Sequence, residues 1–189
     1  GLVVASTRSS GLVAIDNSKF SAQAICADCE EQMINSAEFI DRNLLLIASN
    51  SGLYTYSFLN RKMQVVTPFA SEEITCLLLK KKRDGCWVGT KEKGVYELTF
   101  TESQSLVVVR NISKETGLSG NSVQCIFEEK QGTLWVATLE GGIHKLVPAE
   151  NYRCTFYQKE QGLGNEFVKV MLQDAEENLW LGTYGGGLF

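Results

Sequence analysis

Residues 132–138 have the sequence Gly-Thr-Leu-Trp-Val-Ala-Thr, and Gly141-Gly142-Ile143 follows two residues later. The phrase returns at residues 177–183 as Glu-Asn-Leu-Trp-Leu-Gly-Thr, followed by Gly186-Gly187-Leu188. Fainter copies occur upstream. When the five copies are aligned, the same position is occupied by Val3, Leu46, Trp87, Trp135 and Trp180. Successive members of this series are separated by 43, 41, 48 and 45 residues. A period of about 40–50 residues built from short strands is typical of a β-propeller.

Residues 117–161 show how one blade is expected to fold. Turn-forming residues separate four short runs, at 123–127, 134–138, 143–146 and 152–158. The inner runs are almost wholly apolar, as expected for strands covered on both faces, whereas the last run alternates between polar and apolar residues. The sequence therefore predicts four-stranded antiparallel blades.

We expect a single all-β domain over residues 1–189, a partial β-propeller of about four to five blades. The blade pieces are approximately 1–33, 34–72, 73–116, 117–161 and 162–189. Residues 20–33 fit least well. We assign residues 23–26 to an outer strand, with a helical insertion as the alternative. Because the chain opens inside a strand-like run and complete propellers have about four to eight blades, we expect it to be a piece of a longer protein.

Composition excludes some classes of function. The net charge is −4, from 18 basic and 22 acidic residues. Nucleic-acid-binding domains usually carry a clear basic excess, so we expect no nucleic acid among the partners. No apolar run approaches the roughly 20 residues that span a bilayer, so we expect no membrane segment in this chain.

Six cysteines are present, and most occupy apolar repeat positions. Cys76 and Cys125 stand at the same point of two repeats, where Val170 stands in another. They are therefore expected to behave as small buried hydrophobic residues. Cys26 and Cys29 have the spacing of a metal or redox pair, but no second pair follows. A zinc site and a local disulfide both stay open for this pair, and we expect no cofactor and no bound metal.

The residues from Asn121 to Ile143, and again from Asn165 to Leu188, resemble the two-component regulator propeller repeat. The Gly-Leu pairs at residues 117–118 and 162–163 also fit this repeat. The resemblance covers the whole chain by period and is specific from about residue 73 onward.

This resemblance implies a setting for the chain. Such repeats form the periplasmic sensor of hybrid two-component regulators of the Bacteroidetes type, which are inner-membrane proteins that often respond to oligosaccharides. The implied partners are an oligosaccharide, the rest of the propeller with its adjoining sensor domains, and a second copy in a homodimer. Kinase activity would lie in domains outside this chain.

The candidate ligand site lies on the face formed by the loops before the first strand and between the second and third strands of each blade. Sugar recognition needs an aromatic platform with amide, carboxylate or charged partners. The residues of this kind on the predicted face are Tyr184, Glu140, Asn121, Asn165 and Lys91. The alternative interpretation is that the asparagines favour turn conformations and that Glu140 is solvated.

Other candidates have structural interpretations. Trp87, Trp135 and Trp180 are expected to pack between blades. His144, the only histidine, stands at an ordinary strand position, and the chain has no Gly-x-Ser-x-Gly motif, so we do not expect an enzyme. Two alternatives to a ligand sensor stay open: a protein-interaction propeller without a small ligand, and a propeller lyase or glycosidase.

Overall fold

The computed structural model describes residues 2–7, 11–16, 21–24, 32–103, 105–139, 141–149 and 152–189. The chain divides into two compact units, residues 1–74 and 75–189. Cys26, Cys29 and Glu140, which the sequence singled out, lie outside the described residues.

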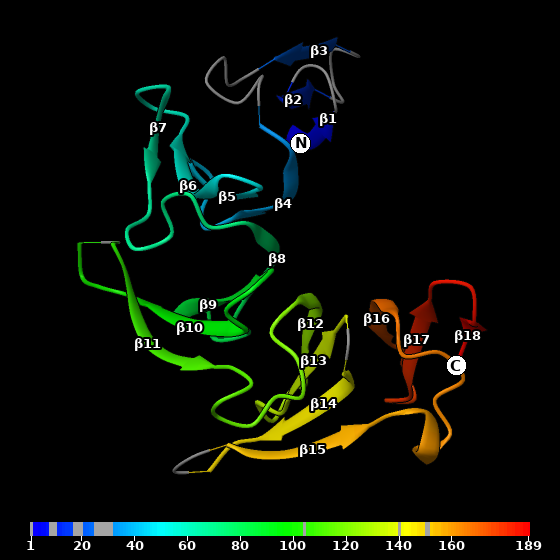
Figure 1. The fold of residues 1–189 in the computed structure, drawn as a ribbon. Coiled ribbons are helices and arrows are strands. Elements are labelled where there is room, and N and C mark those ends of the chain that lie inside the picture. Colours follow the sequence, from blue (N-terminus) through cyan, green and yellow to red (C-terminus); the bar gives the residue numbers. More distant parts are fainter. Residues whose placement is uncertain are drawn as a thin grey trace. The chain divides into compact units, whose positions relative to one another are not determined.

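The first unit contains two antiparallel sheets whose strands follow one another in chain order (Figure 1). One sheet comprises β1 (Leu2–Thr7), β2 (Gly11–Asp16) and β3 (Ser21–Ala24). The other comprises β4 (Ile34–Phe39), β5 (Leu44–Ser49), β6 (Gly52–Ser57) and β7 (Lys62–Val65). β3 includes Gln23 and Ala24 of the outer strand expected at residues 23–26, and residues 25 and 26 lie outside the described part of the chain.

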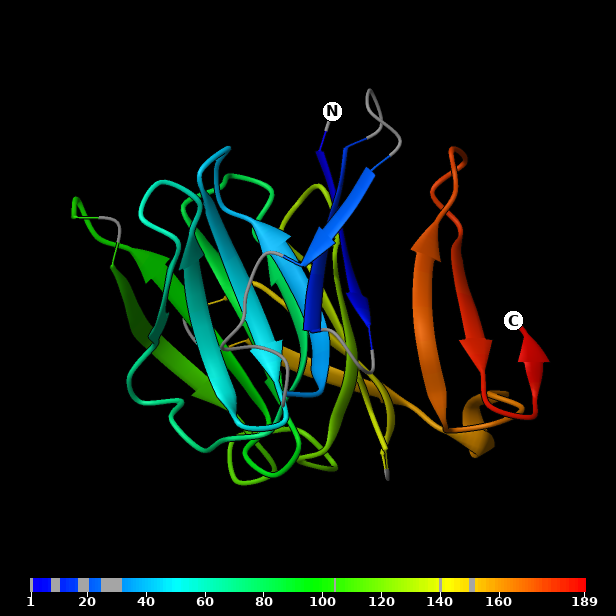
Figure 2. The same cartoon turned by 90° about the horizontal axis from the view of Figure 1, so that it is seen from above.

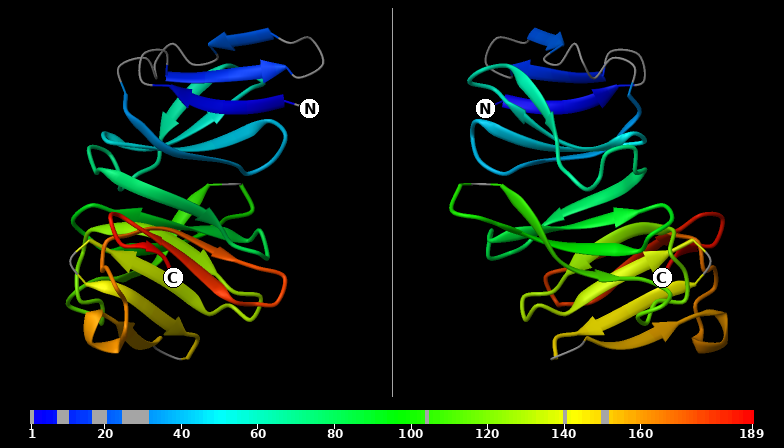
Figure 3. Two further views of the ribbon diagram at one scale, coloured as in Figure 1. Left: turned by 90° about the vertical axis from the view of Figure 1, so that its right-hand side faces the viewer. Right: turned by 60° about the vertical axis from the view of Figure 1, so that its left-hand side comes forward.

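The second unit contains three further sheets (Figure 2). The first has β8 (Ile74–Leu79), which begins at the unit boundary, then β9 (Gly85–Thr90), β10 (Val95–Phe100) and β11 (Leu106–Ile112). The next has β12 (Val123–Glu128), β13 (Leu134–Thr138), β14 (Gly142–Val147) and β15 (Arg153–Tyr157). A short 3₁₀ helix, Lys159–Gln161, leads from β15 to the last sheet (Figure 3), which has β16 (Val168–Gln173), β17 (Leu179–Thr183) and β18 (Gly187–Leu188).

The fold is an all-β propeller built from antiparallel blades, which confirms the predicted class. Each sheet is a meander in which every strand pairs with its successor in the chain. The first strand of three sheets carries a register shift at the same place, at Ile34/Ser36, Val123/Cys125 and Val168/Val170. Such a bulge increases the local twist of a strand. The sequence repeat is therefore also a repeat of backbone geometry.

The core of each unit consists of the apolar inner strands. In the first unit, Leu45, Ile47 and Tyr56 form a buried cluster with Leu12 and Ile34. In the second unit, β9 is buried along its whole length. Its Trp87 packs in one cluster with Leu118 of the loop before β12 and with residues of the following sheet, namely Val123, Leu134, Val136 and Leu146.

Close packing explains why a small residue stands two positions after each tryptophan. A Cβ atom at Gly89 would lie 2.5 Å from Cys76 Sγ and 2.7 Å from Val123 Cγ1, so any larger side chain would collide with the neighbouring inner strands. Gly182 holds the same position in the last sheet, where a Cβ would lie 2.6 Å from Val170 Cγ1.

The three tryptophans differ in burial. Trp87 is 1% exposed and packs against the following sheet. Trp135 is half-buried and lies against a cluster that includes Leu163 and Val168. Trp180, which was expected between blades, is 41% exposed. Its sheet is the last in the second unit, so no following sheet of that unit covers the indole.

Three cysteines lie in the inner strands, and two of them, Cys76 and Cys125, are partly buried. Cys86 is fully buried, and burial raises the pKa of Cys76, Cys86 and Cys125 to about 12 in each case. The thiolate is the reactive form of cysteine, so these side chains act as small hydrophobic residues.

Candidate functional site

The loops that precede the first strand of a sheet and those that join its second and third strands lie together in the second unit. We call their shared surface the loop face. Leu139 N donates to Ser122 O over 2.8 Å, and Tyr184 N donates to Phe167 O over 2.8 Å. These two bonds hold equivalent positions in successive sheets, so the loop face repeats with the blades.

Two of the predicted ligand residues, Asn165 and Tyr184, meet on the loop face. Asn165 Nδ2 donates to the carbonyl oxygen of Tyr184 over 2.8 Å, and Asn165 Oδ1 accepts from Phe167 N over 2.8 Å. Both polar atoms of the amide therefore hold the backbone of neighbouring loops. The Tyr184 side chain is 74% exposed and presents its ring to solvent.

Asn121 also bonds to backbone. Its Oδ1 accepts from Lys114 N over 2.7 Å, and its carbonyl oxygen accepts from Gly94 N over 3.0 Å. The second bond joins the loop before β12 to the β9–β10 loop, which carries the exposed Lys91. The structure thus places Asn121 near the Lys91 loop and Asn165 near Tyr184, with each amide in a structural contact.

His144 is buried in β14 and has a partner at each ring nitrogen. Nδ1 lies 3.2 Å from the Val136 carbonyl oxygen, which can only accept, so Nδ1 carries the proton. Nε2 then accepts from Ser119 N over 2.9 Å, and Ser119 Oγ lies 2.6 Å away. Burial lowers the pKa of His144, which keeps the ring neutral. The histidine therefore fastens the loop before β12 to the sheet.

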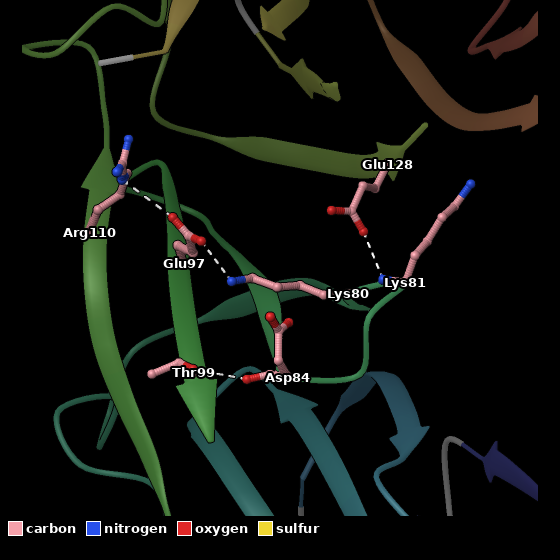
Figure 4. Close-up of polar contacts among 7 residues, drawn as sticks. All are labelled: Lys80, Lys81, Asp84, Glu97, Thr99, Arg110 and Glu128. Carbon is pink, nitrogen blue, oxygen red and sulfur yellow. Dashed lines mark hydrogen bonds and ion pairs between the residues drawn. The ribbon is translucent and has the colours of Figure 1, made fainter. Parts of the chain in front are cut away.

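A charged cluster lies on the sheet that precedes β12, where Glu97 stands between two cations (Figure 4). Lys80 Nζ lies 2.6 Å from Glu97 Oε1, and Arg110 Nε lies 3.3 Å from Glu97 Oε2. The Lys80 ammonium is also 5.4 Å from the centroid of the Trp87 ring. The run of basic residues at 80–83 thus contributes one partly buried ion pair and a hairpin turn.

The described residues of the second unit line a larger and a smaller cavity. One, of about 590 Å³, is bounded by β11, Leu146, Tyr152 and Cys154. The other, of about 270 Å³, lies between Trp135, Tyr157, Leu181 and Phe189. None of the predicted ligand residues that the structure describes lines either cavity.

The family comparison identifies the repeats. Residues 117–140 and 162–185 match the family model described as the two component regulator propeller. These segments are two-component regulator propeller repeats. No curated protein matches the sequence.

Solved structures share the fold of these repeats at low sequence identity. Two extracellular domains from B. thetaiotaomicron, both described as belonging to hybrid two component systems, match with TM-scores of 0.76 and 0.75 and identities of 20% and 21%. The matches cover 99% and 97% of this chain and 24% of each domain. The chain therefore spans about a quarter of the length of these domains. The computationally designed Ika8 protein also matches, with a TM-score of 0.67, 14% identity and coverage of 99% and 54%.

In both two-component regulator propeller repeats a carboxylate holds the tryptophan. Trp135 Nε1 donates to Glu129 Oε1 over 2.6 Å, and Trp180 Nε1 donates to Asp174 Oδ2 over 2.7 Å. The spacing of six residues is the same in both, and a search for acidic residues at a fixed distance from tryptophan would have found it. Hydrogen bonds from Asn178 and Trp180 lower the pKa of Asp174.

The repeat containing Trp87 lacks this carboxylate. Lys81 stands at the equivalent position, and Trp87 Nε1 is buried without a hydrogen-bond partner in the described part of the chain. The indole instead contacts Tyr152, with ring centroids 6.0 Å apart and an interplanar angle of 71°.

No group of three or more His, Cys, Asp and Glu side chains in the described residues is arranged to hold a metal ion. Those residues also form no helix with the length and apolar character needed to cross a membrane.

Proposed function

We propose that this chain is part of an extracytoplasmic sensor propeller of a hybrid two-component regulator, which recognises a ligand and signals to a kinase outside the chain. The observation that carries this proposal is the match of two repeats to the two-component regulator propeller. The fold shared with extracellular domains of such systems supports it, although the fold alone also occurs in a designed protein. The proposed location is the periplasm, in an inner-membrane protein.

The proposed ligand is an oligosaccharide bound on the loop face. Tyr184 supplies the exposed aromatic ring on which a sugar can stack, and Lys91 and Glu140 supply charged partners. Asn121 and Asn165 serve the site indirectly, because their side chains hold the loops that carry these groups.

Calorimetric titration of the purified chain with a panel of oligosaccharides tests the proposal. We expect at least one oligosaccharide to bind wild type and Tyr184→Ala to weaken its binding roughly tenfold, since a stacked ring contributes about 0.5–1.5 kcal/mol beyond its buried area. Phe156→Ala is the matched control, because Phe156 is 51% exposed on β15. Failure of every oligosaccharide to bind, or equal effects of the two variants, would contradict the loop-face site.

A protein-interaction propeller is the second candidate, and one observation favours it. The side chains of Asn121 and Asn165 are bonded to backbone, and neither described cavity opens among the predicted ligand residues. Predicted residues that line neither of these two cavities suit a protein partner better than a small ligand. If the second candidate is right, the loop-face variants will weaken capture of a protein from the same compartment while oligosaccharides leave that capture unchanged.

A further inference from the structure

The cavity of about 590 Å³ has the size of a ligand pocket and lies apart from the loop-face residues. Arg110, Asn111 and Ile112 of β11 form one side, and Leu146 and Cys154 of the following sheet form the other. All these residues belong to the second unit. The cavity therefore lies between two consecutive blades, at their outer strands.

Arg110 brings an incompletely satisfied cation to this cavity. Its Nε lies 3.3 Å from Glu97 Oε2, but the same carboxylate also pairs with Lys80 at 2.6 Å, so one anion serves two cations (Figure 4). Within the described residues the two Nη nitrogens of Arg110 have no hydrogen-bond partner. Guanidinium presents these donors as a planar fork that matches a carboxylate.

The Arg110 fork is held in place by an aromatic ring. The guanidinium carbon lies 5.1 Å from the centroid of Tyr152, and Tyr152 in turn contacts Trp87 edge to face. Stacking on one side and the Glu97 ion pair on another restrict the Arg110 side chain, which reduces the entropy lost when it binds a ligand. The site is thus partly preorganised.

The other residues that line the cavity are mostly apolar and could contact the ring of a small organic ligand. Ile112 and Leu146 are buried apolar residues, and Thr116 also lines the cavity, with its hydroxyl bonded to the backbone of Ser113. Asn111 Nδ2 already donates to the carbonyl oxygens of Lys93 and Val95. Asn111 therefore forms part of the cavity wall but does not supply this donor to a ligand. Apolar walls with a few placed polar groups are typical of small-molecule sites.

We propose that this cavity binds a small organic carboxylate, with the Nη atoms of Arg110 on the carboxylate oxygens and the ring or chain of the ligand between Tyr152, Ile112 and Leu146. The site is separate from the loop face and does not depend on the proposed oligosaccharide. The Arg110 side chain is 34% exposed and lines the cavity, so its Nη donors are open to solvent and can exchange water for a carboxylate.

The test uses the full chain, labelled with ¹⁵N, and three probes: D-glucuronate, benzoate and D-glucose. The first two carry a carboxylate on a ring, and glucose is the uncharged match of glucuronate. We expect at least one carboxylate to bind with a dissociation constant of about 1 mM or tighter, and glucose to bind at least about tenfold more weakly. Chemical-shift changes should concentrate at residues 109–112, 116, 152 and 154, including the Nε–H of Arg110.

Variants separate charge from fork geometry. Arg110→Gln should weaken carboxylate binding about tenfold or more, and Arg110→Lys should restore only part of it because the ammonium cannot bind in the bidentate mode. Lys130→Gln is the matched control, since it removes one positive charge at an exposed ion pair with Glu177. Tyr184→Ala should leave this binding unchanged, which distinguishes the cavity from the loop face.

The wild-type experiment alone can overturn the inference. Shift changes elsewhere, binding of glucose as tight as that of the better carboxylate, or no binding of either carboxylate at 10 mM would each refute it, even if an Arg110 variant failed to fold.

Discussion

The indole Nε1 of Trp135 donates a 2.6 Å hydrogen bond to Glu129 Oε1, across the turn between β12 and β13. The same contact joins Trp180 and Asp174 one repeat later, at 2.7 Å. In each case an acidic residue of a polar turn satisfies the only polar atom of the largest apolar side chain in the blade. The bond requires the acidic turn residue to stand six positions before the tryptophan, and this spacing is the same in both repeats.

Removing this acceptor should destabilise the second unit. Glu129→Ala leaves the half-buried indole N–H of Trp135 without its charged partner, at an expected cost of about 1–2 kcal/mol in the free energy of unfolding. A double-mutant cycle with Trp135→Phe, measured by urea denaturation, isolates the contact. The exposed Lys130→Ala change is the control. Additive effects of the two substitutions would show that the bond contributes nothing.

Truncation of tryptophan should have unequal effects in different repeats. Trp87→Ala should cost about 3–5 kcal/mol, because it opens a cavity in a closed cluster. Trp180→Ala should cost distinctly less, because 41% of that residue is already exposed. Urea denaturation of both variants provides the comparison. Equal losses would mean that the indole of Trp180 is covered in solution.

These tryptophans show how far sequence reasoning extends. The repeat period predicts the propeller, whereas the tight packing at Gly89 is shown only by its contacts with Cys76 and Val123. The exposure of Trp180 could not be predicted from its own repeat, because burial of the indole depends on the sheet that packs against it. The strand β3 begins at Ser21, two residues before the expected start, because its register is set by the pairing with β2.

The loop face could be predicted from local sequence, whereas the cavity could not. Turn residues and the phase of the repeat are local properties, and they predict that Asn165 and Tyr184 lie on loops of the same face. The open fork of Arg110 depends on contacts with Glu97 and with Tyr152, which is distant in sequence. No motif marks such a site, so only the packed blades show it.

Stability should fall below neutral pH because of His144. The ordinary pKa of 6.5 applies in the unfolded chain, while burial lowers the pKa in the folded chain. Between these values the unfolded state binds the extra proton, so unfolding becomes easier as the pH decreases through about 6.5. Urea denaturation at pH 7.5 and 5.5 measures the difference.

His144→Gln provides the control for this pH dependence. His144 is the only histidine, and the carboxylates with lowered pKa, Glu115 and Asp174, titrate below 4.5. The variant should therefore lose most of the change in stability between pH 7.5 and 5.5. An unchanged slope in His144→Gln would assign the effect to another group.

Three inner-strand thiols should resist modification in the folded chain. Burial raises the pKa of Cys76, Cys86 and Cys125 to about 12, so at pH 8 only about one thiol in ten thousand is ionised. Labelling with iodoacetamide followed by peptide mass spectrometry should leave these three unmodified in native protein and modified in urea. Rapid native labelling of any of them would show that its strand opens.

The structural role of Asn165 can be separated from ligand binding by hydrogen exchange. Asn165→Ala removes the bonds to Tyr184 O and Phe167 N, so the amides of Phe167 and Tyr184 should exchange about tenfold faster, as expected for the loss of about 1.4 kcal/mol of local protection. Asn165→Asp keeps the acceptor for Phe167 N and loses the donor to Tyr184 O. It should therefore protect Phe167 while the Tyr184 loop exchanges faster. If both variants leave both amides as protected as in wild type, the side chain does not hold these loops, and its amide is available to a ligand after all.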